Sequence, residues 1–356
     1  MAAASAMACA PERPPWEVPS VVWAGEHLEY APQDGAHEPC AGTLPYMDRY
    51  VELVAEVMDV ELEQPLVYIH GSDDAETLCQ NADALGCTRG SEIFAHVIPQ
   101  EHELVHGVRA SQGFSHFFFE EGAAEAFGDD AHMPMRTRAH GELLEGIASG
   151  TREGLPIEWY PRAGHFAAFL HEEYGSEVTT ALLRRTDRDT PAMRAIAVIE
   201  ETTGVPFEEL RREYERERTC TQAQYRYPVF GCEEPVVQRV RCDETDAVGM
   251  STMIACDDSA TLGPRDGEIW KYLAFEVVDD GEYWVSAYSP VAASSERIEV
   301  KECALGCGSV FVEKPVGIVL GAGPVAMRAG RYVMKVVRPE GEPGEVQLGV
   351  RGAGCG

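Results

Sequence analysis

The 356-residue sequence has few basic side chains and no long apolar run. Its 29 Lys and Arg stand against 60 Asp and Glu, which gives a formal net charge of −31. A surface this negative repels phosphate backbones and anionic lipid head groups, so it argues against nucleic acid as a partner. The sequence also contains no run of about 18 apolar residues, so it predicts no membrane-spanning helix.

Two motif classes are missing as well. The sequence has no pair of CxxC motifs with the spacing of a structural zinc site, and no EF-hand spacing for calcium. It also lacks an internal repeat of fixed period. What remains is the composition of a globular protein, with 45% hydrophobic and 25% charged residues, which excludes disorder as a description of the whole chain. The length suggests two domains, at roughly 150 residues each.

Eleven cysteines are present, and seven of them lie from Cys220 onward. Because disulfides persist in oxidising compartments, we expect an extracytoplasmic protein, which is secreted, periplasmic or a cell-surface lipoprotein. Buried free thiols in a cytosolic protein are the alternative. Four close pairs suggest local links, although sequence alone does not determine connectivity. These pairs are Cys79 with Cys87, Cys220 with Cys232, Cys242 with Cys256, and Cys303 with Cys307.

The N-terminal segment, residues 1–24, has two interpretations that both stay open. Small residues precede Cys9, as at the end of a bacterial lipoprotein signal, where the cysteine would carry a lipid anchor. The segment has no basic n-region and is short for a signal peptide, so a flexible Ala/Pro-rich lead-in explains it equally well. Residues 10–40 are rich in Pro, Glu and Gly and predict an extended lead-in to the first domain.

Hydrophobic patterning changes near residue 220. Before this point, an amphipathic helix from Pro45 to about Leu62 and strands at 65–71 and 91–97 are predicted. Further helices are predicted at 99–110, 119–128, 163–174, 176–185, 190–203 and 206–217. Beyond it, short alternating runs between Gly-, Pro- and Asp-rich turns are typical of an all-β sandwich. These runs lie at 272–278, 282–288, 297–303, 331–337 and 345–351.

The pentapeptide HELVH at 102–106 carries the clearest functional signal. On a helix, His102 and His106 are four residues apart and project from one face, where two neutral imidazoles can share a metal ion. Glu103 lies beside them, where it can take a proton from a metal-bound water. Because this pattern also arises by chance in an acid-rich chain, a second and independent signal is needed.

The stretch EEGAAEAFG at 120–128 supplies that second signal. A catalytic zinc ion uses three protein ligands and leaves one position open for water. On a second helix, Glu121 and Glu125 would project from one face. We expect Glu121 to bind the metal and Glu125 to accept a hydrogen bond from a ligating histidine. Glu120, Glu125 and His116 remain alternatives for the third ligand.

HELVH followed by FFFEEGAAEAF resembles the gluzincin metallopeptidases, whose motifs are HExxH and a later glutamate in a stretch like WLxEGxAEY. The resemblance is to the peptidase-MA-like group of bacterial exported proteins and covers about residues 40–220, including YPRAGHFAAFLHEEYG and TTGVPFEELRREY. It implies His102, His106 and Glu121 as Zn²⁺ ligands and Glu103 as the general base. Glu125 would contact a ligand without binding the metal itself. The chain departs from the family in its shorter gap of fourteen residues between the motifs and in having Phe119 rather than Trp.

Hydrolysis of a peptide bond develops an anionic oxygen, which needs a hydrogen-bond donor beside the metal. The resemblance implies a Tyr or His from a downstream helix for this role. Tyr160 is the first candidate and His165 the second. A tyrosine packed between a helix and a loop is the alternative interpretation of Tyr160.

The sequence therefore predicts an α+β protein with two domains. A zincin-like metallopeptidase domain of a small sheet plus helices is expected at 25–218, and an all-β sandwich at 219–356. EIWKYLAFEVVDDGEYWVSAY, in the second domain, resembles the pre-peptidase C-terminal sandwiches of secreted bacterial peptidases, which implies binding, positioning or secretion. The predicted function is zinc-dependent hydrolysis of a peptide or protein substrate. A catalytically weak or inactive peptidase-fold lipoprotein that acts as a binding scaffold is the alternative, and the oligomeric state is open.

Overall fold

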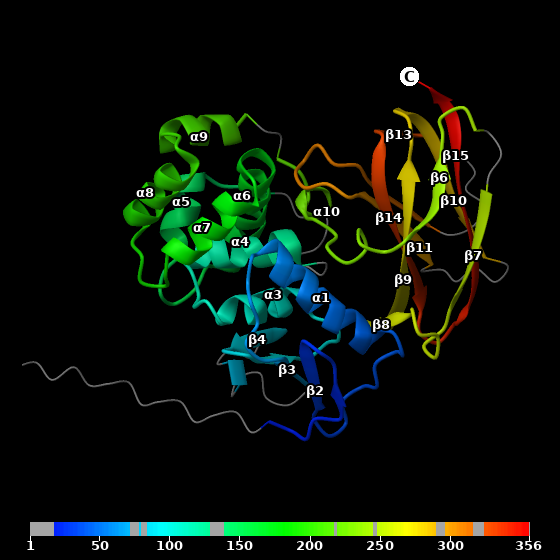
Figure 1. Cartoon of the computed structure of the whole chain (residues 1–356), viewed down its shortest axis with the longest axis horizontal. Coiled ribbons are helices and arrows are strands. Elements are labelled where there is room, and N and C mark those ends of the chain that lie inside the picture. Colours follow the sequence, from blue (N-terminus) through cyan, green and yellow to red (C-terminus); the bar gives the residue numbers. More distant parts are fainter. Residues whose placement is uncertain are drawn as a thin grey trace, which may run out of the picture.

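The computed structural model describes residues 18–355 except 72–77, 80–83, 129–138, 217–218, 245–247, 290–295 and 316–323. Cys9, the predicted lipid attachment point, lies outside the described residues. The chain is a mixed α/β protein, as predicted, with helices and a sheet of short strands in its first part and two further sheets in its second part (Figure 1).

The small sheet has the strand order β1-β2-β3-β5-β4. Its strands are β1 (Trp23–Ala24), β2 (Leu28–Pro32), β3 (Leu66–His70), β4 (Gly86–Arg89) and β5 (Glu92–Ala95). The predicted strands at 65–71 and 91–97 are confirmed as β3 and β5, which are parallel to each other. The lead-in predicted for residues 10–40 instead contributes β1 and β2 to this sheet, because the apolar positions of LEYAP face the core. β4 runs antiparallel to β5 and forms the outer strand on the side of the site described below.

Helices account for most of the rest of the first part. They are α1 (Thr43–Val57), α3 (Glu101–Ala110), α4 (Phe117–Phe127), α5 (Leu143–Ser149), α6 (Tyr160–Tyr174), α7 (Ser176–Arg185), α8 (Ala192–Thr203), α9 (Phe207–Tyr214) and α10 (Gln222–Tyr225). The predicted helices are confirmed with shifted ends. The first one stops at Val57 rather than about Leu62, because Asp59 adopts a positive φ of 51°. The short helices α5 and α10 were not predicted, because one or two turns give too little periodicity.

Close packing of α4 on α6 depends on a glycine. A Cβ at Gly122 would lie 2.6 Å from the carbonyl oxygen of Ala163, too near for any larger residue. Pro161 occupies the first turn of α6, where its missing N–H costs nothing, and Gly175 ends the helix with a φ of 86°. This contact fixes the position of the acidic residues of α4 relative to the N-terminal end of α6.

The second part consists of two sheets with a shared core. One has the order β13-β10-β15-β7 and the other β12-β11-β14-β9-β6, with β8 paired to β9. The strands are β6 (Val236–Val240), β7 (Val248–Ile254), β8 (Leu262–Arg265), β9 (Glu268–Val277), β10 (Gly281–Tyr288), β11 (Arg297–Glu302), β12 (Phe311–Pro315), β13 (Val325–Met327), β14 (Gly330–Pro339) and β15 (Gly344–Cys355). Buried side chains of both sheets, such as Phe275 and Tyr283, belong to one apolar cluster. All five predicted strands are confirmed.

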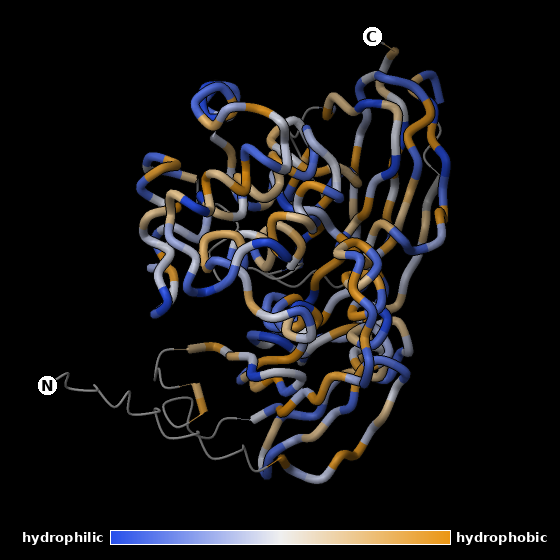
Figure 2. Tube along the Cα trace, turned by 60° about the vertical axis from the view of Figure 1, so that its left-hand side comes forward, coloured by the Kyte–Doolittle hydropathy of each residue, from blue (hydrophilic) through white to orange (hydrophobic). Residues whose placement is uncertain are grey.

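The two parts of the chain pack against each other through an apolar core. Trp270 and Tyr272 of β9 belong to the same buried cluster as the residues of α1, and the ring of Tyr46 lies 4.5 Å from that of Phe230. Figure 2 shows apolar stretches in both parts of the chain, including where they meet. The change in hydrophobic patterning near residue 220 therefore marks where the strand-rich part begins, but it does not separate two independent cores.

Five disulfides join the described cysteines. Cys79–Cys87 is present as predicted, but the other three local pairs are wrong. The observed links are Cys40–Cys256, Cys220–Cys307, Cys232–Cys303 and Cys242–Cys355. The reason is that these cysteines sit at the ends of elements whose neighbours in space are distant in sequence, by 71 to 216 residues. Five disulfides indicate an oxidising, extracytoplasmic environment.

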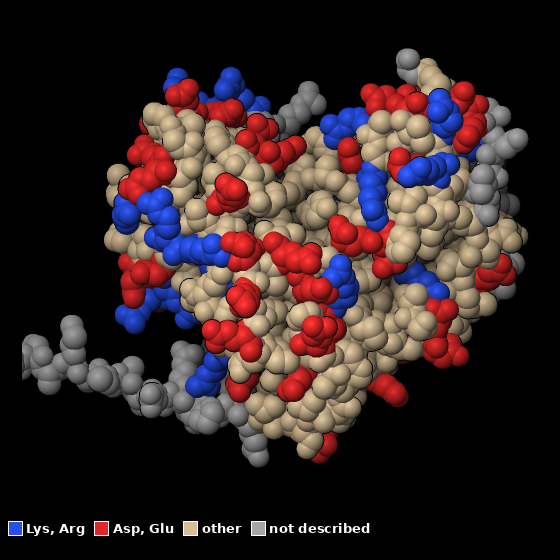
Figure 3. Space-filling view, in the orientation of Figure 1, with Lys and Arg blue, Asp and Glu red and all other residues tan. Residues whose placement is uncertain are grey.

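The surface carries more acidic than basic side chains on the face that Figure 3 draws. Figure 3 shows Asp and Glu spread over the visible face among fewer Lys and Arg, so the negative charge there is not concentrated in a single patch. Within the described residues, no helix has both the length and the apolar character needed to cross a bilayer.

Candidate metal centre

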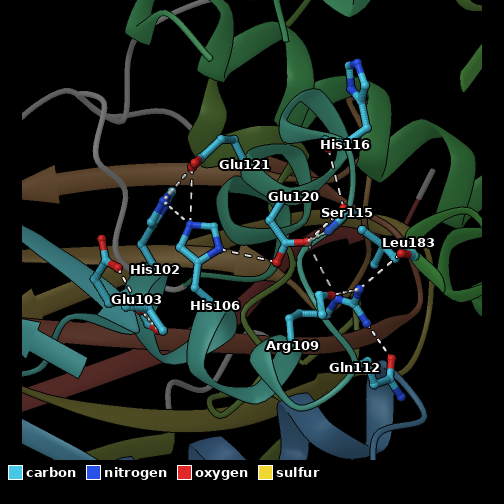
Figure 4. Close-up of polar contacts among 12 residues, drawn as sticks. His102, Glu103, His106, Arg109, Gln112, Ser115, His116, Glu120, Glu121 and Leu183 are labelled. Atoms are coloured by element: carbon cyan, nitrogen blue, oxygen red, sulfur yellow. Dashed lines mark hydrogen bonds and ion pairs between the residues drawn. The ribbon is translucent and has the colours of Figure 1, made fainter. Parts of the chain in front are cut away.

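Helices α3 and α4 carry the predicted ligands and are buried along almost their whole length. On α3, Leu104, Val105 and Val108 are fully buried, and a Cβ at Gly107 would lie 2.6 Å from Ile93 of the sheet. Apolar packing on several sides therefore fixes the rotation of α3. This rotation directs the histidines of α3 towards α4 (Figure 4).

Three potential ligand atoms converge between the two helices. The Nε2 atoms of His102 and His106 lie 3.2 Å apart, and Oε2 of Glu121 lies 3.1 Å from the first and 3.3 Å from the second. All three residues are buried, with 7% or less of their surface exposed. The structure therefore brings together the two histidines and the carboxylate that the sequence predicts as metal ligands.

Each imidazole is backed by a carboxylate on its other nitrogen. Nδ1 of His102 lies 3.2 Å from Oε1 of Glu125, and Nδ1 of His106 lies 3.5 Å from Oε1 of Glu120. A carboxylate at Nδ1 favours a proton there and leaves the Nε2 lone pair directed to the common point. Acceptor atoms that face one another at these distances favour a proton or a metal ion between them, and two histidines plus one glutamate form a set of ligands that could hold a metal ion such as zinc.

The alternatives for the third ligand lie elsewhere. Glu120 and Glu125 both contact the Nδ1 side of the rings. Glu120 points about 100° away from Glu121 around the helix, whereas Glu125 lies one turn further along the same face. Glu120 also accepts hydrogen bonds from the backbone N–H and the hydroxyl of Ser115, at 3.0 and 2.8 Å. His116 caps α4, where its Nδ1 accepts from the N–H of Phe118.

Sequence reasoning missed the role of Glu120 as the partner of His106. Arg109 of α3 lies 3.9 Å from the same carboxylate, so Glu120 is held by both helices. The only sequence signal was an acidic residue next to the predicted ligand, and it does not distinguish a ligand from its neighbour.

Glu103 and Tyr160 line the same cleft as the three converging residues. The Glu103 carboxylate accepts a hydrogen bond of 3.0 Å from the hydroxyl of Thr88 on β4. The Tyr160 ring is parallel to that of His102, with centroids 5.9 Å apart, and its hydroxyl bonds to Glu121. His165, the second candidate donor, is instead bonded to Tyr214 at 2.7 Å and lies 2.9 Å from the sulfur of Cys307.

Burial and carboxylates act in opposite directions on the two histidines. Burial lowers the pKa of His102, but hydrogen bonds with Glu121 and Glu125 outweigh it and raise the pKa to about 9. The pKa of His106 is raised in the same way, well above its usual value. Burial would raise the pKa of Glu121, yet the two histidines lower it. The cluster thus stabilises positive charge at its centre, which a proton or a metal ion can supply.

Tyr160 is held in its protonated form. Burial, followed by the charges of Glu121 and Glu103, raises the pKa of its phenol above the usual value. A phenol that keeps its proton remains a hydrogen-bond donor at neutral pH, which is what an oxyanion requires.

The cleft has a volume of about 770 Å³. One wall is β4, where Gly86 leaves room for Glu103, because a Cβ at that position would lie 2.8 Å from the Glu103 Cγ. The lining also includes Phe114, over whose ring the guanidinium of Arg188 lies at 4.1 Å. The converging ligand atoms therefore lie beside the outer strand of the small sheet, within reach of a molecule that enters the cleft.

No protein-family model and no curated protein matches this sequence. Among solved structures, the pre-peptidase C-terminal domain of a Bacillus anthracis collagenase is 10% identical, with a TM-score of 0.22, over 33% of this chain and 98% of that domain. The periplasmic inhibitor of g-type lysozyme PliG from Salmonella Typhimurium is 15% identical, with a TM-score of 0.20, over 32% of this chain and 96% of that one. Legionella pneumophila aminopeptidase A is 7% identical, with a TM-score of 0.33, over 89% of this chain and 34% of that one. At these TM-scores, none of the three similarities establishes a family or an activity for this chain.

Proposed function

We propose that this chain is an extracytoplasmic zinc metallopeptidase of the gluzincin type. In this proposal, a zincin-like domain at 25–218 binds zinc through His102, His106 and Glu121, and a β-sandwich follows at 219–356. The observation that carries the proposal is the meeting of three acceptor atoms within 3.3 Å, with a carboxylate behind each imidazole. Positive charge at the centre stabilises such a cluster, and a zinc ion would supply that charge through the three protein ligands that a catalytic zinc uses.

The residues around the cluster can perform the proton transfers of hydrolysis. Zinc, when bound, supplies a Lewis acid that polarises a carbonyl and lowers the pKa of a water. Glu103 takes the proton of the attacking water and returns it to the leaving amine. Tyr160 donates its phenolic hydrogen to the oxygen that becomes negative.

The cleft favours an extended peptide as the substrate. β4 is the outer strand of its sheet in the described part of the chain, and its residues Gly86 and Thr88 line the cleft beside Glu103. A peptide that adds to such an edge gains backbone hydrogen bonds and places its carbonyls along the strand. The five disulfides support action outside the cytoplasm, and lipid attachment at Cys9 remains a prediction.

Metal content and hydrolysis together test the proposal. Purified wild-type protein should contain about one zinc per chain and cleave members of a diverse peptide library. Glu121→Ala should lose the zinc and the activity, because two imidazoles alone hold the ion weakly. Glu145→Ala is the matched control, since Glu145 is an exposed acid on α5, and it should keep both.

Two results would contradict the proposal in different ways. A folded wild-type protein that takes up no zinc would remove the metal site and leave a binding scaffold. Zinc uptake that Glu121→Ala abolishes, without cleavage of any peptide, would leave a zinc-binding protein that is not a peptidase.

A further inference from the structure

The single helical turn α10 links the second part of the chain to the metal centre. Gln222 on this turn donates a hydrogen bond of 2.7 Å from its side-chain amide to Oε2 of Glu125, 97 residues earlier. The other oxygen of Glu125 lies 3.2 Å from Nδ1 of His102. Gln222 and Glu125 are both fully buried. Gln222 therefore begins a buried series of polar contacts, which passes through Glu125 and ends at the proposed zinc ligand His102.

Local structure leaves the Glu125 side chain little freedom. A Cβ at Gly164 of α6 would lie 2.7 Å from Cβ of Glu125 and 2.9 Å from the hydroxyl of Tyr225, so these three residues are in close contact. The start of α10 is itself fixed by a capping box, in which Thr221 and Gln224 exchange side-chain and backbone hydrogen bonds. The orientation of the Glu125 carboxylate relative to the Gln222 amide is therefore fixed.

The second part of the chain holds α10 in place. A disulfide joins Cys220, two residues before Gln222, to Cys307 in the connection between β11 and β12. Lys301, at the end of β11, is buried and donates to the backbone carbonyl of Gln224 and to the hydroxyl of Ser309. A covalent bond and a buried lysine amine, both from the second part of the chain, thus fix the turn that carries the Gln222 amide.

We propose that Gln222 is a positioning residue of the metal centre, and that the second part of the chain sets its position through the Cys220–Cys307 disulfide. An amide donor on one carboxylate oxygen aims the other oxygen at the imidazole, which keeps the His102 ring in the orientation for metal binding. The C-terminal part then contributes to metal affinity itself, in addition to any binding of substrate. This inference rests on the proposed function, because it requires zinc to bind at His102.

Zinc affinity measured by competition with a chelator is the appropriate assay, because it does not depend on turnover. Gln222→Met keeps the size of the side chain but removes the donor. We expect it to weaken zinc binding by about tenfold, at the lower end of the 10- to 100-fold that loss of an outer-shell partner causes. Glu125→Leu should weaken it more. In the Glu125→Leu background, Gln222→Met should have no further effect, because the two residues act in series.

The disulfides offer a matched pair of variants. Cys220→Ser/Cys307→Ser and Cys232→Ser/Cys303→Ser open links of similar sequence separation, 87 and 71 residues, in the same unit. The chain-entropy model predicts a similar loss of unfolding free energy for both. We expect only the first pair to weaken zinc binding severalfold, with the folded state of each variant verified by circular dichroism before titration.

The outcomes separate this inference from the proposed function. If the wild type binds zinc and Gln222→Met binds it equally well, the positioning role is wrong and the peptidase proposal stands. If both disulfide variants weaken zinc binding to the same extent, the specific role of the Cys220–Cys307 link is wrong. A wild type that binds no zinc overturns both the proposed function and this inference.

Discussion

Replacing Glu103 by glutamine isolates the proposed proton transfer from metal binding. The amide has nearly the shape of the carboxylate, and its oxygen can still accept the hydrogen bond from Thr88. Glu103 is not among the residues whose atoms converge between α3 and α4. We therefore expect Glu103→Gln to fold normally and to keep its zinc.

The expected effect on hydrolysis follows from the two proton transfers that Glu103 would perform. General base and acid assistance contributes about 10²- to 10⁴-fold, so kcat/KM should fall by that factor, or about 3 to 5 kcal/mol in activation free energy. Thr88→Val should have a smaller effect, roughly tenfold, because it removes one hydrogen bond to the carboxylate and leaves the base in place.

The assay compares kcat/KM on a peptide that the wild type cleaves, together with zinc content. Glu92→Gln is the control, since Glu92 lies on the neighbouring strand β5 and outside the cleft lining. Wild-type activity in Glu103→Gln would refute the assignment of the base. Loss of zinc in this variant would show that Glu103 supports the ligands rather than the reaction.

Two further predictions concern protonation and cross-linking. Because the His102 ring donates hydrogen bonds to carboxylates, its pKa is raised to about 9 against the effect of burial, and a proton must leave this ring when zinc binds. Zinc affinity, measured by chelator competition from pH 6 to 8, should rise about tenfold or more per pH unit, and a constant affinity would contradict the assignment. Cys40–Cys256 closes a loop of 216 residues and Cys79–Cys87 one of 8, so serine variants should lose about 5 and about 2.5 kcal/mol of unfolding free energy. Denaturant unfolding measures both, and a larger loss for the shorter link would contradict the loop-entropy explanation.

The two parts of the chain are more closely connected than their composition suggests. Arg265 on β8 lies 3.7 Å from the carboxylate of Glu101, the residue before His102, and Tyr46 donates to the same carboxylate at 2.8 Å. The second part of the chain therefore approaches the metal centre at the start of α3 as well as through Gln222. We expect truncation near residue 220 to damage the first part, because it would expose the apolar surface that α1 shares with β9.

Several elements were predictable because their signals are local. The spacing of His102 and His106 places both rings on one face of any helix, and the spacing of Glu121 and Glu125 does the same on the next helix. The five alternating runs of the second part became strands because a period of two fits a half-buried strand. β2 was not predicted, since LEYAP is short and does not alternate strictly between apolar and polar residues, and its strand conformation depends on pairing with β3.

The sequence by itself determined which residues could meet a metal ion, because helical periodicity is a property of a few neighbouring residues. Only the tertiary structure decided that Glu120 turns to His106, that Gln222 reaches Glu125, and that four of the five disulfides join distant cysteines. These contacts depend on how whole elements pack, and the number of pairings open to eleven cysteines or sixty acids is too large for local spacing to select among them.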